Sequence, residues 1–449
     1  LHVPRTLASM TVQYYILAMS DSALAQGQAS FEALPAYREC AELDATALSA
    51  YDDLPTLAGA PPFDLTRTLR QEHYHLMSVF LPTPGADDTQ SGALTPLWSL
   101  KQGFARYGSE QNFYRATLLR PSESHSFTAL TYDSYHCHIA SVTSVDGCQT
   151  QAVYDYRLLL PIKIIDPQGS IQQALYDAFG QLQATSIYGH ERGKPTGFAP
   201  LTQYRRPADD SPPAAIQAPE AALLNAASAC FYSPFSWMGQ IPASPQRAQW
   251  IAEGYLTPEG HIRASGRTRV ATLDLMQPDN RLFSEQIRLA RREPVYSAVL
   301  QADTYTTSDP DITRHIHINL TCSDGFGRVL QTKQKTSAGM AYVVDSSGRL
   351  SQDSQAKPLS QHSEKRWRVS GRVEYNNKGL AIRSYRPYFA DQYGYIEDDA
   401  LRKNGLSDQL FYDPLGRLTS KINAKGDLSR QTYHTWYTVS EDENDTFED

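Results

Sequence analysis

The chain is 449 residues long, with 41% hydrophobic and 20% charged residues and a formal net charge of -8. This length predicts two or three domains or one extended repeat architecture. The 41 Lys and Arg residues form no basic stripe, so nucleic acid is not expected as a partner. The most apolar window, residues 221–239, is interrupted by Asn225 and Pro234. It therefore predicts a buried helix followed by a turn, and no membrane span.

The five cysteines and the two chain ends indicate what kind of chain this is. The cysteines are odd in number and form no CxxC pair, which argues against a disulfide framework or a zinc knuckle. The chain starts at Leu1 without a methionine or a signal peptide, and it closes on the acidic run SEDENDTFED. We interpret it as a fragment of a larger protein whose acidic tail is a solvated loop.

Residues 1–100 are expected to form a mixed segment with short helices. Alanine and leucine are dense at residues 23–34 and 40–48, which favours helix there. A loop signal rich in Pro, Gly and Asp follows at residues 81–92.

Residues 101–206 are expected to form a first block of repeats. Tyr-Asp pairs recur in it every 22 residues (154 − 132 and 176 − 154), each followed by a turn signal and alternating residues. A fixed period of this size is typical of repeat proteins, in which neighbouring units supply the core that one unit lacks. The pairs are Tyr132-Asp133, Tyr154-Asp155 and Tyr176-Asp177, with Gly180 in the last turn.

Residues 207–265 are expected to be an insertion between two repeat blocks. Seven prolines lie between Pro207 and Pro245, on either side of one predicted helix at residues 220–229. A second repeat block is then expected over residues 266–449.

The clearest repeat unit starts at Tyr412 and has the sequence YDPLGRLTSKINAKG. Its residues 413–416 have the order Asp, Pro, Leu, Gly that a type I turn prefers. Residues 417–422 then alternate polar and less polar side chains, which predicts a half-buried strand. A second turn signal at residues 423–426 completes a unit of strand, turn, strand, turn.

Weaker copies of this unit lie at residues 323–334, 345–352 and 375–385. The heavy use of tyrosine, 27 residues, also favours strands. In this interpretation each tyrosine stacks on a neighbouring tyrosine across the strands, and each aspartate fixes its turn. The predicted motif positions are Tyr132, Asp133, Tyr154, Asp155, Tyr176, Asp177, Gly180, Asp324, Gly327, Arg328, Tyr375, Gly379, Tyr412, Asp413, Gly416 and Arg417.

Such a repeat predicts a mainly β fold, a sheet ribbon with a few short helices. About 20 units would give about 40 strands, far more than the roughly 10 that an open twisted sheet tolerates. The ribbon is therefore expected to wind or close on itself, and a closed ribbon of this width encloses space.

Few residue patterns in the sequence indicate metal binding, phosphate binding or catalysis. Three His-x-His pairs, starting at His73, His136 and His315, could each place two imidazoles on one strand face, but a zinc site needs three or four ligands, so solvent-facing histidines are the favoured reading. The run GHERGKPTG at residues 189–197 has neither the spacing nor the final Ser or Thr of a phosphate-binding loop. No hydrolase or metalloprotease motif is present, so we expect neither catalysis nor a cofactor.

The motif YDxxGRL followed by a glycine turn resembles the YD repeat of the RHS family. Three further stretches resemble the later part of the B component (SpvB/TcdB-like) of bacterial insecticidal toxin complexes: RQEHYHLMSVFLP, segments within residues 131–180, and WYTVSEDENDT. The resemblance covers the chain from about Arg70 onward.

The resemblance implies a secreted, non-enzymatic shell protein. B and C components of these complexes wind an RHS ribbon into a hollow cocoon around the toxic domain of the C component, and the assembly docks on a pore-forming A component. The B component also carries a β-propeller, and the 40 to 50 residue repeats of a propeller are not found here. The chain therefore resembles the C-terminal shell portion of a B component.

Two other functions stay open at this stage. Abundant tyrosines would also suit a carbohydrate- or receptor-binding β-repeat surface. An ADP-ribosyltransferase is suggested only by the SpvB part of the family name, and no catalytic constellation in the sequence supports it.

Overall fold

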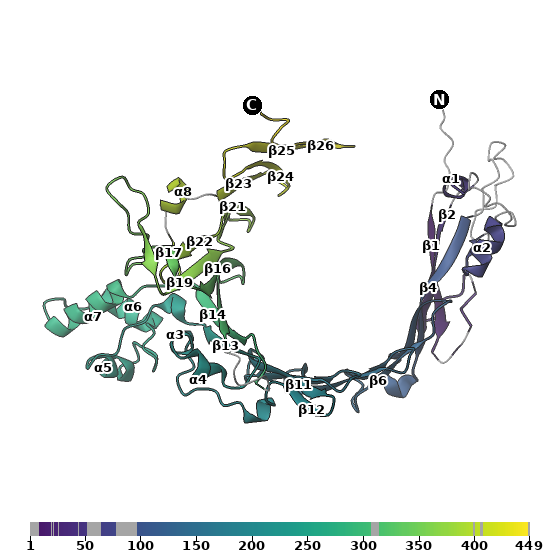
Figure 1. The fold of residues 1–449 in the computed structure, drawn as a ribbon, viewed down its shortest axis with the longest axis horizontal. Helices are drawn as coiled ribbons and strands as arrows, with labels where there is room; N and C mark the ends of the chain where they lie inside the picture. Colours follow the sequence, from purple (N-terminus) through teal and green to yellow (C-terminus); the bar gives the residue numbers. More distant parts are fainter. Residues whose placement is uncertain are drawn as a thin grey trace. The chain divides into compact units, whose positions relative to one another are not determined.

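A computed structural model describes residues 9–18, 20, 22–25, 27–43, 45–51, 64–77, 97–306, 314–397, 400–404 and 407–447. The chain divides into two compact units, Leu1–Gln172 and Gln173–Asp449. Both are built mainly from antiparallel strands, so the predicted mainly β fold is confirmed (Figure 1). Within the described residues, no helix combines the length and the apolar character that crossing a membrane requires.

The first unit is an antiparallel sheet in which the strands pair in the order β1-β2-β4-β5-β6-β7-β8-β9, and β3 also pairs with β4. Its elements are β1 (Met10–Leu17), β2 (Ala33–Leu43), α1 (Ala45–Ser49), α2 (Leu65–Gln71), β3 (His75–Met77), β4 (Leu97–Tyr107), the 3-10 turn Glu110–Asn112, β5 (Ala116–Ser122), β6 (Thr128–Tyr132), β7 (Ile139–Thr143), β8 (Gln149–Asp155) and β9 (Leu160–Ile165). Strand β10 (Ile171–Tyr176) contains the boundary between the units.

Most of this first sheet is a single layer. A small core of Ala41, Met77 and Leu97 lies near its start, under β2, β3 and β4. From residue 100 to residue 172, by contrast, no side chain is buried. Backbone pairing and contacts between side chains on one face must therefore hold these strands, because their residues are not buried under a second layer among the described residues.

The second unit contains the longer mixed part of the chain. Its strands are β11 (Leu182–Glu191), β12 (Lys194–Gly197), β13 (Ser228–Ser233), β14 (Val295–Ala302), β15 (Ile316–Ser323), β16 (Val329–Thr336), β17 (Gly339–Tyr342), β18 (Ser360–Ser363), β19 (Arg366–Ser370), β20 (Val373–Tyr375), β21 (Ala381–Tyr385), β22 (Tyr388–Ala390), β23 (Ser407–Tyr412), β24 (Leu418–Ile422), β25 (Leu428–Tyr433) and β26 (Thr438–Glu441). Its helices are α3 (Pro212–Gln217), α4 (Pro219–Leu223), α5 (Arg247–Ala252), α6 (Ala264–Val270), α7 (Pro278–Leu289) and α8 (Ala400–Asn404), with 3-10 turns at Leu201–Gln203 and Ser236–Met238.

The strands of this unit form two sheets. Strands β11, β13, β14, β15, β16, β19 and β22 pair in that sequence, all antiparallel, whereas β17 meets β22 in a parallel bridge. A separate six-stranded sheet runs β20-β21-β23-β24-β25-β26. The turn and strand pattern predicted at residues 412–433 is present in it as β23, β24 and β25.

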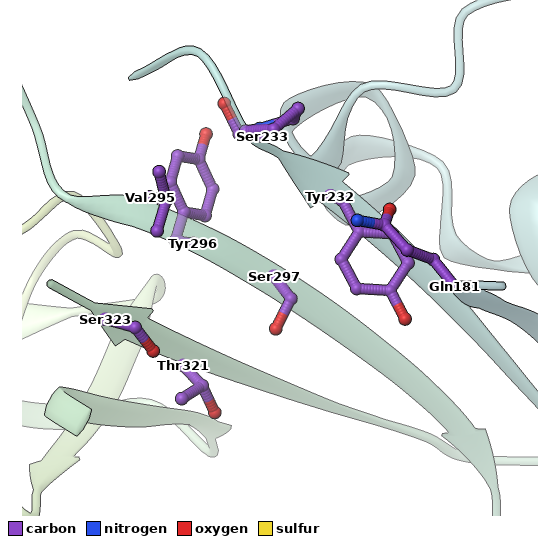
Figure 2. Close-up of a pocket in the computed structure, with 9 residues that line it drawn as sticks. Gln181, Tyr232, Ser233, Val295, Tyr296, Ser297, Thr321 and Ser323 are labelled. Carbon is purple, nitrogen blue, oxygen red and sulfur yellow. The ribbon is translucent and has the colours of Figure 1, made fainter. Parts of the chain in front are cut away.

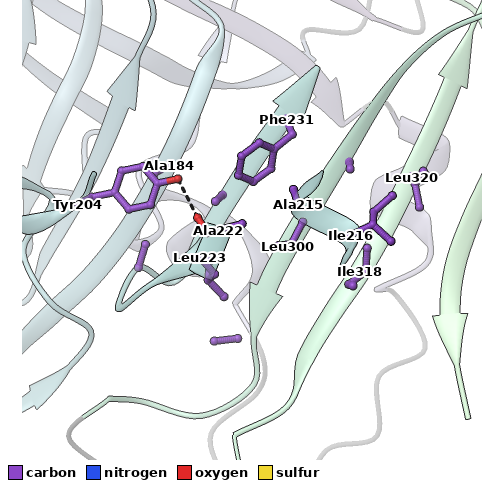
Figure 3. Packing of buried hydrophobic residues seen from close by; sticks show 14 of the residues in the cluster. Ala184, Tyr204, Ala215, Ile216, Ala222, Leu223, Phe231, Leu300, Ile318 and Leu320 are labelled. Carbon is purple, nitrogen blue, oxygen red and sulfur yellow. Dashed lines mark hydrogen bonds between the residues drawn. The ribbon is translucent and has the colours of Figure 1, made fainter. Parts of the chain in front are cut away.

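Helices cover one face of the first of these sheets. Helices α3 and α4 pack on β13 and β14, where Leu223, Phe231 and Leu300 are fully buried (Figures 1 and 3). The hydroxyl of Tyr204 donates to the carbonyl of Ala222 at 3.1 Å, which closes the end of this core (Figure 3). Helices α5, α6 and α7 enclose a second, smaller core around Trp250, Ile262 and Phe283.

The helix predictions at residues 23–34, 40–48 and 220–229 were right only in part. Of the stretches 23–34 and 40–48, only the short α1 (Ala45–Ser49) is helical, because residues 33–43 form β2 between two paired strands. The helix expected at 220–229 ends at Leu223, where Leu224 has a φ of 51°. The apolar run beyond it is the buried strand β13, since a short apolar run fits a central strand as well as a helix. The predicted loop at residues 81–92 lies outside the described residues.

Candidate functional site: the tyrosine and turn network

The turn after each Tyr-Asp pair is held by the aspartate side chain. At the clearest unit, Oδ1 of Asp413 accepts the backbone N–H of Leu415 and of Arg417, each at 2.9 Å. The N–H of Gly416 donates to the Asp413 carbonyl at 2.9 Å, and Gly416 has a φ of 84°, which favours glycine. The aspartate thus satisfies two backbone donors that the turn leaves without a strand partner.

The same side-chain contacts recur at other turns. Oδ1 of Asp177 accepts from the N–H of Phe179 and Gln181, and Oδ1 of Asp324 accepts from Phe326 and Arg328. Asn376 replaces the aspartate one unit later and accepts from Lys378 and Leu380. An amide oxygen therefore performs the turn function as well as a carboxylate. The turn glycines Gly180, Gly327 and Gly379 all have positive φ.

Charge reinforces several of these turns. The backbone N–H of Arg417 and its guanidinium hold the pKa of Asp413 below its ordinary value. The guanidinium of Arg157 lowers the pKa of Asp155 to about 2. The pKa of Asp133 is also lowered, because the N–H groups of Cys137, His138 and Tyr135 outweigh the effect of desolvation. These carboxylates are structural acceptors, because each is already engaged by its own turn.

The tyrosine hydroxyls form hydrogen bonds with the preceding unit. Six such contacts lie among the described residues, and in each a tyrosine hydroxyl donates to the backbone carbonyl of the residue that begins the neighbouring strand, directly after the previous turn. Each donor lies at or next to the end of its own strand. The pairs are Tyr132 to Ala116 (2.9 Å), Tyr154 to Ile139 (3.0 Å), Tyr232 to Leu182 (2.8 Å), Tyr375 to Val329 (3.1 Å), Tyr412 to Ala381 (2.8 Å) and Tyr433 to Leu418 (3.0 Å).

Within the described residues, the rings of Tyr154, Tyr375 and Tyr433 face a histidine or an arginine and not another tyrosine, so the predicted tyrosine ladder was wrong at these units. The ring of Tyr433 lies under the guanidinium of Arg417, 4.4 Å from its centroid, and that of Tyr375 lies under Arg328 at 4.5 Å. His138 stacks on Tyr154 at 4.4 Å in the same way. In these three units the ring partner is the residue just before the accepting carbonyl, where a cation or imidazole can use the ring face.

The motif arginine therefore joins two units. Nε of Arg417 donates to Oδ2 of its own turn residue Asp413 at 2.7 Å, while its guanidinium lies on Tyr433 of the next unit. Arg328 repeats both contacts with Asp324, at 2.6 Å, and with Tyr375. In the order Tyr, Asp, x, x, Gly, Arg, Leu, the tyrosine contacts the preceding strand, and Asp and Gly close the turn. The arginine side chain and the leucine carbonyl then receive the tyrosine of the next unit.

The acceptor residues and Tyr232 were missed from the sequence. Tyr232 follows Leu182 by 50 residues, so no fixed period connects them. Its burial raises the pKa of its hydroxyl to about 12. It borders a shallow cavity of about 250 Å³ on the sheet face, next to Gln181, Ser297 and Thr321 (Figure 2). Tyr176, by comparison, ends β10 immediately before the Asp177 turn, as the repeat predicted.

The histidine pairs do not assemble a metal site. His136 has a φ of 53° and lies in a turn, while His75 contacts Glu123 at 2.8 Å. No cluster of three or more His, Cys, Asp or Glu side chains arranged for a metal occurs in the part of the chain that the structure describes. Residues 189–197, which were compared with a phosphate loop, form the plain hairpin of β11 and β12.

Comparison with solved structures identifies the architecture. Crystal structures of TcdB2-TccC3-Cdc42 and of TcdB2-TccC3 without its hypervariable C-terminal region each match all of this chain, with a TM-score of 0.80 and 28% identity. The chain has the fold of the B-component-like RHS shell family. The Photorhabdus luminescens Tc holotoxin pore also matches, over 98% of the chain at 28% identity and a TM-score of 0.77.

This RHS shell fold extends over the whole chain, which spans about a fifth of each of those larger proteins: 20% for the two crystal structures and 19% for the holotoxin pore. No protein-family model and no curated protein matches the sequence. The tyrosine and turn network is therefore part of a fold that this chain shares with about a fifth of each of those proteins.

Proposed function

We propose that this chain is a wall segment of a toxin-complex shell, which builds with a C component a hollow RHS cocoon that encloses a toxic cargo domain. The observation that carries the proposal is the match of the entire chain, at TM-scores up to 0.80, to structures in which TcdB2 is joined to TccC3. In this role the chain would be secreted, and a pore-forming A component would be its indirect partner.

The surface chemistry supports a wall. On β13, β14 and β15, the face that carries Phe231, Ala298 and Leu320 is buried under helices α3 and α4. The opposite face carries a row of hydroxyl groups (Tyr232, Ser297 and Thr321), which lie side by side on paired strands (Figure 2). A face of this kind lacks a large hydrophobic patch that would bind an unfolded chain.

The proposed role requires no catalysis. The aspartates and tyrosines that recur in the chain are engaged in turns and strand contacts, and we propose that the segment holds neither a cofactor nor an active site. Incubation of the purified chain with NAD checks this point, because measurable turnover would revive the transferase hypothesis.

Protection from protease tests the function directly. The parent protein is co-expressed with a C component that carries a tagged toxic domain, and protease is added. We expect the tag to survive with the intact parent and to be cut when this segment is deleted. A parent with Gly416→Val and Gly379→Val, which strains two turns, should give intermediate cutting, whereas a parent with Gly325→Ala serves as matched control because a Cβ there meets open space. Equal cutting in all parents would refute the wall.

The second candidate is a carbohydrate- or receptor-binding surface, which is favoured by exposed turn tips. Tyr135, Phe179, Phe326 and Leu415 occupy the third position of Asp turns and are 64%, 91%, 88% and 79% exposed. A glycan array with the isolated chain tests this alternative, and loss of any signal in Tyr135→Ser would locate it. An array without signal would remove its support.

A further inference from the structure

The cavity beside Tyr232 lies at a unit where the repeat has glutamine in place of its arginine. The backbone N–H of Gln181 donates to Oδ1 of Asp177 at 2.8 Å, and the carbonyl of the next residue, Leu182, accepts the hydroxyl of Tyr232 at 2.8 Å. Gln181 therefore holds, in its own unit, the position that Arg417 holds in the clearest unit.

Arginine at this position covers the ring of the incoming tyrosine. The guanidinium of Arg417 lies 4.4 Å from the ring centroid of Tyr433, and that of Arg328 lies 4.5 Å from the ring centroid of Tyr375. The side chain of Gln181 is shorter and has no guanidinium. A cavity of about 250 Å³ lies here, lined by Gln181 and Tyr232 (Figure 2).

Three hydroxyl side chains line the same cavity. Ser297 is the strand partner of Tyr232, and Thr321 is the strand partner of Ser297, so these side chains lie side by side on one sheet face. Ser323 follows two residues later on the same strand and faces the same side. Among the described residues, the side chains of Gln181, Ser297, Thr321 and Ser323 form no hydrogen bond with another group. The cavity thus offers three hydroxyls and one amide, which can all donate and accept.

The chemistry of the lining selects the class of ligand. None of the nine lining residues carries a formal charge, and burial raises the pKa of Tyr232 to about 12, so its hydroxyl is neutral at neutral pH. An ionic ligand would find no opposite charge here, and a purely apolar ligand would leave the hydroxyls without partners. An aromatic ring beside a few convergent neutral polar groups suits a ligand that has both hydroxyl groups and apolar C–H groups.

We propose that this cavity binds one ring of a neutral saccharide. The C–H groups of the sugar lie against Tyr232, and its hydroxyls bond to Ser297, Thr321 and Gln181. The cavity of about 250 Å³ exceeds by about eightfold the roughly 30 Å³ that one water molecule occupies, which admits a single sugar ring. The site lies on the sheet face and not at the exposed turn tips, and it does not depend on the proposed shell function.

Saturation-transfer NMR with the full chain is the test. The probes are the methyl glycosides of glucose, galactose, mannose and N-acetylglucosamine, with acetamide as a separate amide probe. We expect saturable binding of at least one glycoside. Thr321→Val removes one hydroxyl at nearly constant volume and should weaken that binding roughly fivefold. Thr150→Val is the matched control, because Thr150 is a strand threonine outside the cavity and its loss should leave binding unchanged.

Gln181→Arg separates binding from folding. The new side chain should fill the cavity and abolish glycoside binding, while the urea midpoint stays equal or rises. The reason is that the new guanidinium can contact the Asp177 carboxylate and the Tyr232 ring, as the motif arginine does in other units. Absence of glycoside binding, a signal from acetamide alone, or glycoside binding that survives both Gln181→Arg and Thr321→Val would overturn the site. None of these results changes the protease assay, so the saccharide site and the shell are refuted separately.

Discussion

Removal of tyrosine hydroxyls from the six-stranded sheet is the sharpest test of the network. Tyr375, Tyr412 and Tyr433 donate to carbonyls of neighbouring strands at 3.1, 2.8 and 3.0 Å. Phenylalanine keeps each ring and its contacts but leaves the carbonyl without this donor. One such bond contributes about 1 kcal/mol, so the triple variant should lose about 3 kcal/mol if the three sites are independent. Domains have total stabilities of about 5–15 kcal/mol, so the loss would be large.

Native-state hydrogen exchange is the appropriate measurement, because it reports opening of this sheet separately from the rest of the chain. The amides of β23, β24 and β25 should lose protection in the triple variant, with smaller losses in each single variant. Tyr437→Phe is the control, since its exposed hydroxyl reaches no carbonyl of a neighbouring strand among the described residues. A triple variant that exchanges like the wild type, or a control that loses as much, would refute the assignment of stability to these bonds.

Three further outcomes follow from the turns and the buried charge. Asp413→Ala should destabilise the sheet in urea unfolding, whereas Asp413→Asn should not. Because the pKa of Asp413 is lowered in the folded chain, its carboxylate contributes to stability above pH 4, and this contribution is lost in acid. The Asn variant should therefore lack this acid dependence of stability. Gly416→Ala should cost about 1–2 kcal/mol in the same assay because of its φ of 84°, although Ala356 tolerates a φ of 59° at the matching turn position. Lys333 is buried and donates to the Gly394 carbonyl, and burial lowers its pKa to about 8. The unfolded chain then binds more protons than the folded chain between pH 8 and about 10.4, so stability should rise by roughly 3 kcal/mol across that window, and Lys333→Met should flatten the rise.

The sequence was sufficient for the local part of the fold. The turn at residues 413–416 and the alternation after it depend only on neighbouring residues, so Asp, Gly and period two predicted β23, β24 and the turn between them. The resemblance in the motif then led to the shell fold that the solved structures share. Local chemistry and a recognisable motif were therefore enough for the architecture.

The partners of the tyrosines could not be predicted, because they depend on which strands become neighbours. Leu182 and Tyr232 are separated by the β11–β12 hairpin, a 3-10 turn and two short helices, and nothing in their spacing indicates contact. Helix propensity was overruled for a related reason at residues 33–43. Alanine and leucine there favour helix in isolation, but the stretch lies between β1 and β4 and buries Ala36 and Ala41 as a strand.

The network also explains how the ribbon accepts insertions without losing its register. From acceptor to donor, the sequence separation is 15 residues for Leu418 and Tyr433, 31 for Ala381 and Tyr412, and 50 for Leu182 and Tyr232. The hydroxyl contact is similar in all three, at 2.8 to 3.0 Å. The contact requires only that the end of one strand lies beside the start of another. Helices can therefore be inserted in the connection between the two strands. A period of 21 or 22 residues is thus the shortest form of the repeat, and the tyrosine at the strand end is its more general rule.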